Sequence, residues 1–258
     1  AARAGLAWRL TPAAAVGDFA TRAKAKGLSE ADRLAAVTAI AFVPTREAAL
    51  ALVDIAEQAD GRVRQHATWW LMNYKDSRWK EHGLADELKR RKLYDPESIE
   101  ISAITVPEPD RGAEAATSVE AVLSLKGDAT RGATLAQACL LCHRIGDAGA
   151  EYGPTLSGFA QRQPTEVVVR AILQPSADIA LGYAGSEIEL KSGEKVHGLV
   201  HSAGDPLIVQ STGGFTQMIP QDRVKQRRMM GRSLMLNAQQ LGLGNQDVAD
   251  IVAYLKTH

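Results

Sequence analysis

Cys139-Leu140-Leu141-Cys142-His143 is the stretch that decides how this chain is organised. Cys-x-x-Cys-His is the pattern through which haem c is attached to protein. In that chemistry the two thiols form thioether links to the haem vinyl groups, and the adjacent imidazole binds iron as the proximal ligand. The sequence therefore predicts one covalently attached haem c, with Cys139 and Cys142 holding the haem and His143 binding its iron.

The cysteine count supports this prediction, because both cysteines of the chain lie inside the motif. A zinc site would normally need a second pair of cysteines or histidines at ligand spacing. The remaining histidines form no such cluster: His66, His82, His197, His201 and His258. A redox dithiol usually opens a helix after a strand, whereas the segment before Cys139 has a helical pattern. A redox dithiol and a chance match remain the alternatives.

Length and charge set the broad class of the protein. A chain of 258 residues is long enough for two ordinary domains. Lys+Arg and Asp+Glu both number 30, so the charge points neither to nucleic acid nor to a polybasic membrane anchor. No apolar stretch approaches the ~20 residues of a membrane span, and the start shows no signal-peptide pattern. Because haem c is generally attached after export, we expect a periplasmic or otherwise extracytoplasmic protein.

Residues 1–94 are expected to form a helical domain. Apolar positions recur at intervals of three and four residues from position 30 to position 93. The expected helices cover residues 30–42, 46–58 and 78–91, and their N-caps are Ser29, Thr45 and Ser77.

An internal echo lies beneath this helical pattern. Residues 33–40 align at an offset of 31 positions with residues 64–71, and Ile40 matches Leu71. Each copy is followed by a turn and a second helix, so the repeating unit is a helical hairpin that must stack to bury its apolar face. The echo favours HEAT-like helical repeats, and an ordinary small helical bundle is the alternative.

Residues 95–118 are expected to be a linker. Pro96, Pro107 and Pro109 restrict the backbone and favour a semi-stiff, extended connection. Within this segment, residues 99–104 alternate apolar and polar side chains, which predicts a short strand.

Residues 119–258 form the predicted haem domain. Asp128 is the expected N-cap of a helix leading into the haem motif, and Asn245 that of a terminal helix over 246–256. Between them, residues 184–222 switch to strand-like alternation broken by glycine-containing turns, which predicts a small antiparallel sheet of β-hairpins or an SH3-like barrel. This insertion has three open roles: shielding the haem edge, binding a partner, or forming the contact of a homodimer.

Five elements of the haem domain occur in a specific order. They are the haem motif, Gly153-Pro154-Thr155-Leu156, residues 172–176, Ser233-Leu234-Met235 and Ala253-Tyr254-Leu255. With them, residues 126–258 resemble the haem-binding cytochrome c domain common in planctomycete and verrucomicrobial multidomain proteins. The resemblance implies a mainly α class I cytochrome c fold that carries the β insertion. In that family a HEAT-like region often precedes the cytochrome, in agreement with the helical hairpins expected here.

The resemblance also implies two further site residues. Pro154 would return its backbone carbonyl to the Nδ1–H of His143, which fixes the tautomer of the ligand, and a simple loop turn is the alternative. Met235 would be the sixth iron ligand, although Leu236 stands where the family commonly has proline. Another methionine, a histidine of the insertion such as His197, or an open site remain alternatives.

The predicted function is single-electron transfer, as the redox module of a larger dehydrogenase-type protein. A dehydrogenase would be the donor and a small cytochrome or an oxidase the acceptor, with the helical repeats as a docking scaffold. Electron transfer requires no acid–base or nucleophilic residue, so a non-catalytic module is favoured over an enzyme. A haem-based sensor or peroxide-reacting protein with an open or displaceable sixth site is one alternative, and a structural haem is another. The basic run 223–232 has three readings: a solvated face, propionate pairing, or docking of an acidic partner.

Overall fold

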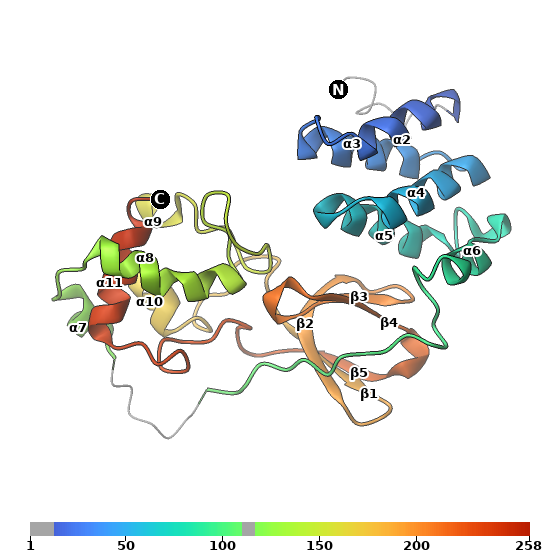
Figure 1. The fold of residues 1–258 in the computed structure, drawn as a ribbon. Coiled ribbons are helices and arrows are strands. Elements are labelled where there is room, and N and C mark those ends of the chain that lie inside the picture. The colour runs from blue at the N-terminus through green and yellow to red at the C-terminus, as the bar shows by residue number, and fades with distance from the viewer. Residues whose placement is uncertain (1–12, 110–116) are drawn as a thin grey trace. The chain divides into compact units, whose positions relative to one another are not determined.

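The computed structural model describes residues 13–109 and 117–258, which divide into two compact units (Figure 1). The first unit runs through Glu100 and also contains Ser202–Ile208 and Met218–Gln221. The second unit contains Ile101–His201, Val209–Gln217 and Asp222–His258. Asp110, Arg111 and Gly112 of the expected linker lie outside the described residues.

The first unit is helical. Its helices are α2 (Val16–Lys24), α3 (Glu30–Ala41), α4 (Arg46–Gln58), α5 (Gly61–Tyr74) and α6 (Leu84–Arg90). The first two predicted caps are confirmed: the Ser29 hydroxyl accepts from the N–H of Asp32, and the Thr45 hydroxyl from that of Ala48.

The third predicted cap, Ser77, is wrong. After α5 the chain turns through a short 3-10 helix, Lys80–His82, and α6 begins only at Leu84. Gly83 separates the two helices with a φ of 65°, a left-handed conformation that favours glycine and interrupts a helix. The fully buried Trp79, whose indole N–H donates to the carbonyl of Val43, anchors this turn in the core.

The two copies of the sequence echo occupy equivalent helices. The first copy lies on α3, which is followed by α4, and the second lies on α5, which is followed by α6. Ala36, Ile40, Ala67 and Leu71 are all buried in the core of this unit. The repeated positions are therefore the positions that face the apolar interior.

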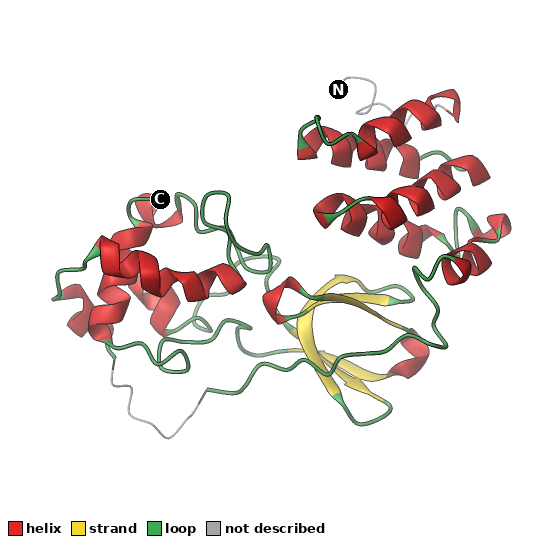
Figure 2. Ribbon diagram, viewed as in Figure 1, coloured by secondary structure: helices red, strands yellow, loops and turns green. Residues whose placement is uncertain are grey.

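The second unit combines helices with a curved sheet (Figure 2). Its helices are α7 (Val119–Leu123), α8 (Ala129–Leu135), α9 (Phe159–Arg162), α10 (Thr165–Leu173) and α11 (Asn245–Leu255). Asp128 caps α8 as predicted, because its carboxylate accepts from the N–H groups of Thr130 and Arg131. The predicted cap of α11 is wrong: Gly244 is the N-cap, and Asn245 instead accepts from the N–H of Ser118 at 3.2 Å.

Helices α8 and α11 cross at close range (Figure 1). A Cβ at Gly132 would overlap the carbonyl oxygen of Asp250, so the crossing requires glycine there. Asp250 is fully buried, and its carboxylate accepts from the N–H of Asp128 and from Gln246, both at 2.8 Å, and pairs with Arg131. Burial opposes its ionisation, but these donors outweigh burial and hold the pKa of Asp250 below its usual range.

The strands form one antiparallel sheet in the order β4-β3-β2-β1-β5. They are β1 (Ser186–Leu190), β2 (Lys195–Ser202), β3 (Leu207–Gln210), β4 (Thr216–Ile219) and β5 (Val224–Met229). The expected hairpins of the insertion correspond to the first four strands. Strand β5 was not predicted from the sequence. It pairs with β1, although the side chains of β5 are mostly exposed and many are basic.

The strand expected over residues 99–104 is wrong. Residues 101–109 form an extended segment that joins no backbone ladder. The side chain of Gln217 takes the place of a neighbouring strand, because its amide bonds both the N–H and the carbonyl of Ser102, each at 3.0 Å. Among the helices of the described residues, none has the length and apolar character that a membrane crossing demands.

Candidate functional site

The haem motif lies where α8 tightens into a 3-10 helix, Ala136–Leu141. Cys142 follows that helix, and the N–H groups of Cys142 and His143 both donate to the carbonyl of Cys139, at 3.1 and 2.8 Å. This turn gathers the two thiols and the imidazole within a single loop of chain. Both cysteines are free, half-buried thiols.

The imidazole of His143 has a defined tautomer. Its Nδ1 lies 2.6 Å from the backbone oxygen of Pro154. A carbonyl oxygen only accepts, so Nδ1 carries the proton and Nε2 keeps its lone pair for a metal ion. Burial lowers the pKa of His143, and the bond to Pro154 offsets part of that effect, which leaves a neutral imidazole at neutral pH.

Gly153 lies flat against the same ring. Its N–H donates to the carbonyl of Cys142 at 2.6 Å, and a Cβ built on it would lie 2.5 Å from Cε1 and 2.7 Å from Nδ1 of His143. No side chain fits between this backbone and the imidazole. Sequence analysis quoted Gly153 only as part of a motif, because a contact between backbone and ring leaves no mark in sequence.

The two thiols lack the electrostatics of a redox dithiol. Burial raises the pKa of both Cys139 and Cys142, and the N–H of Gly213 offsets this only in part at Cys142. Reactive dithiols have a lowered thiol pKa. The described residues also hold no group of three or more His, Cys, Asp or Glu side chains placed to bind a metal ion, which argues against zinc.

The β insertion forms a wall beside the motif. The turn Thr212–Gly214, between β3 and β4, approaches Cys142 through Gly213. An apolar cluster also surrounds Cys142; its buried members are Val106, Tyr152, Leu199 and Leu234, and Leu199 comes from β2. The insertion is therefore part of the site rather than an appendage to it.

Tyr152 carries the hydroxyl group among the four buried members of this cluster. Its hydroxyl is buried and makes no well-formed hydrogen bond, although Thr212 lies near it. Burial raises the pKa of Tyr152 to about 12. A buried hydroxyl without a proper acceptor costs free energy, so Tyr152 is an orphaned polar group beside the haem motif.

Met235 lies in the loop between β5 and α11. The N–H of Met235 bonds the hydroxyl of Ser233 at 3.0 Å, and the N–H of Ser233 bonds that of Ser176 at 3.0 Å. The structure thus joins two of the five family-like elements. The side chain of Met235 lines a pocket of about 250 Å³ together with Pro175.

The residues lining this pocket, within the described chain, do not include Cys139, Cys142 or His143. The neighbours of Met235, Leu234 and Leu236, do belong to the cluster around Cys142. The structure therefore brings the loop to the haem motif without bringing the thioether of Met235 into that cluster. Met230, another methionine that follows the motif, is partly buried and packs against the cluster.

The two histidines of β2 lie in different environments. His201 is exposed, whereas His197 is buried, with 6% of its surface exposed. Its Nδ1 accepts from the N–H of Val106 at 3.0 Å and its Nε2 lies 3.2 Å from Glu187. Both ring nitrogens are occupied, which argues against His197 as an iron ligand.

The basic run lies mainly on β5 and is largely paired with β1. Lys225 bonds Glu189 at 2.6 Å, and Arg228 pairs with Glu187 at 2.7 Å. Arg232 donates to the backbone oxygen of Val106 at 2.6 Å. These residues stabilise the sheet and its surroundings as well as facing solvent.

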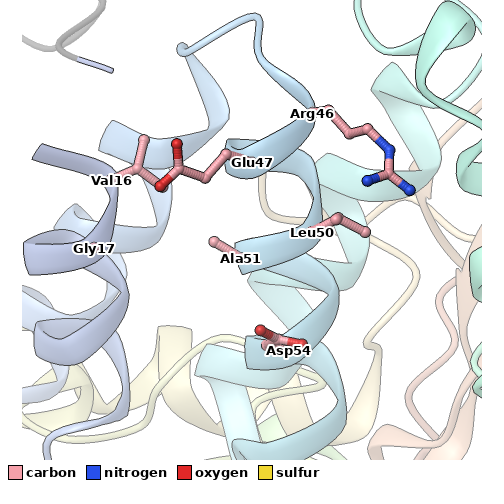
Figure 3. Close-up of a pocket in the computed structure, with 7 residues that line it drawn as sticks. All are labelled: Val16, Gly17, Arg46, Glu47, Leu50, Ala51 and Asp54. Carbon is pink, nitrogen blue, oxygen red and sulfur yellow. The ribbon is translucent and has the colours of Figure 1, made fainter. Parts of the chain in front are cut away.

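An open groove of about 390 Å³ lies on the first unit, where α2 and α4 meet (Figure 3). Its lining combines apolar side chains with Arg46, Glu47 and Asp54. It contains no cysteine, histidine or methionine, so it offers no haem ligand.

The residues around the motif fit a covalently bound haem c. Two thiols stand ready for the vinyl groups, a neutral imidazole presents Nε2, and an apolar cluster with an unsatisfied Tyr152 hydroxyl lies beside them. Residues 129–187 match the family model of cytochrome c. The search of curated proteins found no match. The chain therefore contains a cytochrome c domain, and its cofactor is covalently attached haem c.

Proposed function

We propose that this chain passes single electrons from a dehydrogenase donor to a small cytochrome or an oxidase, as one module of a larger multidomain protein. Bound haem c supplies the reversible one-electron couple. The observation that carries the proposal is the neutral His143 imidazole, held between the carbonyl of Pro154 and the backbone of Gly153. The protein orients the His143 imidazole and surrounds the motif with apolar side chains, and electron transfer needs no catalytic side chain.

We further propose Met235 as the sixth ligand of the iron. A thioether ligand raises the reduction potential relative to a second imidazole. The Ser-Leu-Met context and the packing of Leu234 and Leu236 beside Cys142 support this choice. Met230 is the competing ligand, because it packs against the same cluster as Cys142.

Two alanine variants separate these ligands. A methionine–iron bond gives oxidised cytochromes a weak absorption band in the red. We expect Met235→Ala to abolish this band and lower the midpoint potential, while Met230→Ala retains both. Survival of the band in Met235→Ala together with its loss in Met230→Ala would transfer the assignment to Met230.

A second function, the binding of a gas or peroxide at a displaceable sixth site, has one observation in its favour. Met235 borders a pocket of about 250 Å³ that is not lined by the haem motif, so its side chain has a place to lie outside the haem site. Carbon monoxide distinguishes the two functions. Rapid formation of a carbonyl complex by the reduced native protein supports the sensor, and slow or absent formation supports electron transfer.

The remaining proposals concern location and docking. Cytochrome c domains are typically extracytoplasmic, which supports a periplasmic or similar location. The packing of α2 on α3 and of α4 on α5, together with the equivalent core positions of α3 and α5, supports a HEAT-like scaffold for partner proteins. Binding of a candidate redox partner to the full chain, measured with and without substitutions on these helices, tests the docking role.

A further inference from the structure

Residues 101–109, here called the strap, are bonded along their length to the haem unit. The amide of Gln217 holds Ser102, and the N–H of His197 donates to the carbonyl of Ile104 at 2.8 Å. Two residues later, the N–H of Val106 donates to Nδ1 of His197 at 3.0 Å. The strap is thus held by side chains of the sheet and is not a free connection between domains.

His197 fixes the strap through a defined tautomer. The N–H of Val106 only donates, so Nδ1 of His197 is the unprotonated nitrogen and Nε2–H points to Glu187 at 3.2 Å. Glu187 is held in turn by Lys195 at 3.2 Å and Arg228 at 2.7 Å. The buried imidazole therefore links the strap to β1 and, through Glu187, to Arg228 of β5.

The other side of the strap contacts the loop that carries Met235. Arg232 donates to the carbonyl of Val106 at 2.6 Å, and the side chain of Gln240 donates to the carbonyl of Pro107 at 3.2 Å. One of these loop residues precedes Met235 and the other follows it. Pro109 also lines the pocket that Met235 borders.

The apolar side of the strap reaches the haem motif. The side chain of Val106 is buried, with 5% of its surface exposed, in the cluster that contains Leu234 and Cys142. Val106 therefore bonds His197 with its N–H, bonds Arg232 with its carbonyl, and packs beside Leu234 with its side chain. Val106 thus connects the sheet, the loop that carries Met235 and the apolar cluster around Cys142.

We infer that the strap braces the Met235 loop and that His197 is a positioning residue for the sixth ligand, an inference that rests on the proposed function. Neighbouring groups that hold a metal ligand in place tune its binding, and their loss typically costs 10–100-fold in metal affinity or activity. The brace keeps the Met235 loop in one arrangement, which would favour binding of a haem iron by Met235.

The test compares substitutions at two histidines of β2 in the full-length haem protein. His197→Leu removes both bonds of the ring, His197→Asn keeps an acceptor near the N–H of Val106, and His201→Leu is the matched control at an exposed position. We expect reduced His197→Leu to bind carbon monoxide about tenfold faster than the native protein. His197→Asn should recover most of the native rate, and His201→Leu should match it.

Hydrogen exchange of residues 232–240 provides an independent readout. The inference requires faster exchange of these residues in His197→Leu and in Arg232→Gln. The second variant removes the bond between Arg232 and the carbonyl of Val106, at a more exposed position, and serves as the test if His197→Leu folds poorly. Unchanged exchange in both variants overturns the inference. Faster exchange with an unchanged rate of carbon monoxide binding would support the bracing role of the strap and would contradict the assignment of Met235 as the sixth ligand.

Discussion

At the scale of single residues, backbone groups prepare the imidazole of His143 more than side chains do. The Pro154 carbonyl sets its tautomer, and Gly153 sets how closely the chain approaches the ring. The Gly-Pro pair therefore acts on the ring twice: the carbonyl of Pro154 accepts the hydrogen bond of Nδ1–H, and Gly153 leaves room for the ring.

Gly153→Ala tests this close approach. The added methyl group would meet the ring at 2.5 Å, so we expect the imidazole to turn, the bond to Pro154 to weaken, and the midpoint potential to change. Gly146→Ala is the control, because Gly146 has a φ of 60° but no atom within 4 Å of a built Cβ. The control should lose stability through backbone strain while keeping the native potential, as measured by spectroelectrochemical titration. A native potential in Gly153→Ala would contradict the proposed role of this contact.

At the scale of elements, the packing of α8 on α11 fixes the helix that leads directly into the haem motif. The motif begins inside the 3-10 helix that directly follows α8, and α8 is held against α11 by Gly132 and by the buried Asp250 network. The crossing distance is thus set by the absence of a side chain at Gly132.

Gly132→Ala should separate these helices. We expect a loss of about 2 kcal/mol in the free energy of unfolding, because the new methyl group overlaps the backbone of α11. Gly17→Ala in α2 is the matched control: no atom lies within 4 Å of its Cβ, so the helical preference of alanine should make it neutral or stabilising by up to about 1 kcal/mol. Thermal unfolding followed by circular dichroism measures both. Equal effects of the two substitutions would exclude a steric cause.

Elements also show where sequence patterns fail. The caps Ser29, Thr45 and Asp128 were predictable because a cap bonds its own next turn. Strand β5 was missed because its partner, β1, lies far away in the sequence and its own side chains are basic and exposed. Residues 99–104 alternate like a strand, yet a side chain rather than a strand satisfies their backbone.

At the scale of the whole molecule, the two compact units share the sheet segment of the chain. Ser202–Ile208 and Met218–Gln221 belong to the first unit, and Ile208 is buried in its helical core. Strands β3 and β4 are therefore divided between the two units.

Ile208→Ala tests this division of the chain. The cavity should cost about 3 kcal/mol and fall mainly on the first unit. Trp69, Trp70 and Trp79 lie in that unit, so their fluorescence transition should move to lower temperature, while the transition of the haem absorbance moves less. Phe215→Ala, at an exposed position, should leave both unchanged. A larger shift of the haem transition than of the fluorescence transition would contradict the assignment of Ile208 to the first unit.

The sequence by itself determined the covalently attached haem c and the helix starts after Ser29, Thr45 and Asp128, and it predicts the proximal histidine and the helical hairpins. All of these depend on residues a few positions apart, where spacing fixes chemistry and local hydrogen bonds. Only the tertiary structure decided that His197 is buried, that the expected linker is a strap, and that Gly153 touches the imidazole. His197 and Val106 are 91 residues apart, and no local pattern records a hydrogen bond that forms only after the sheet has folded.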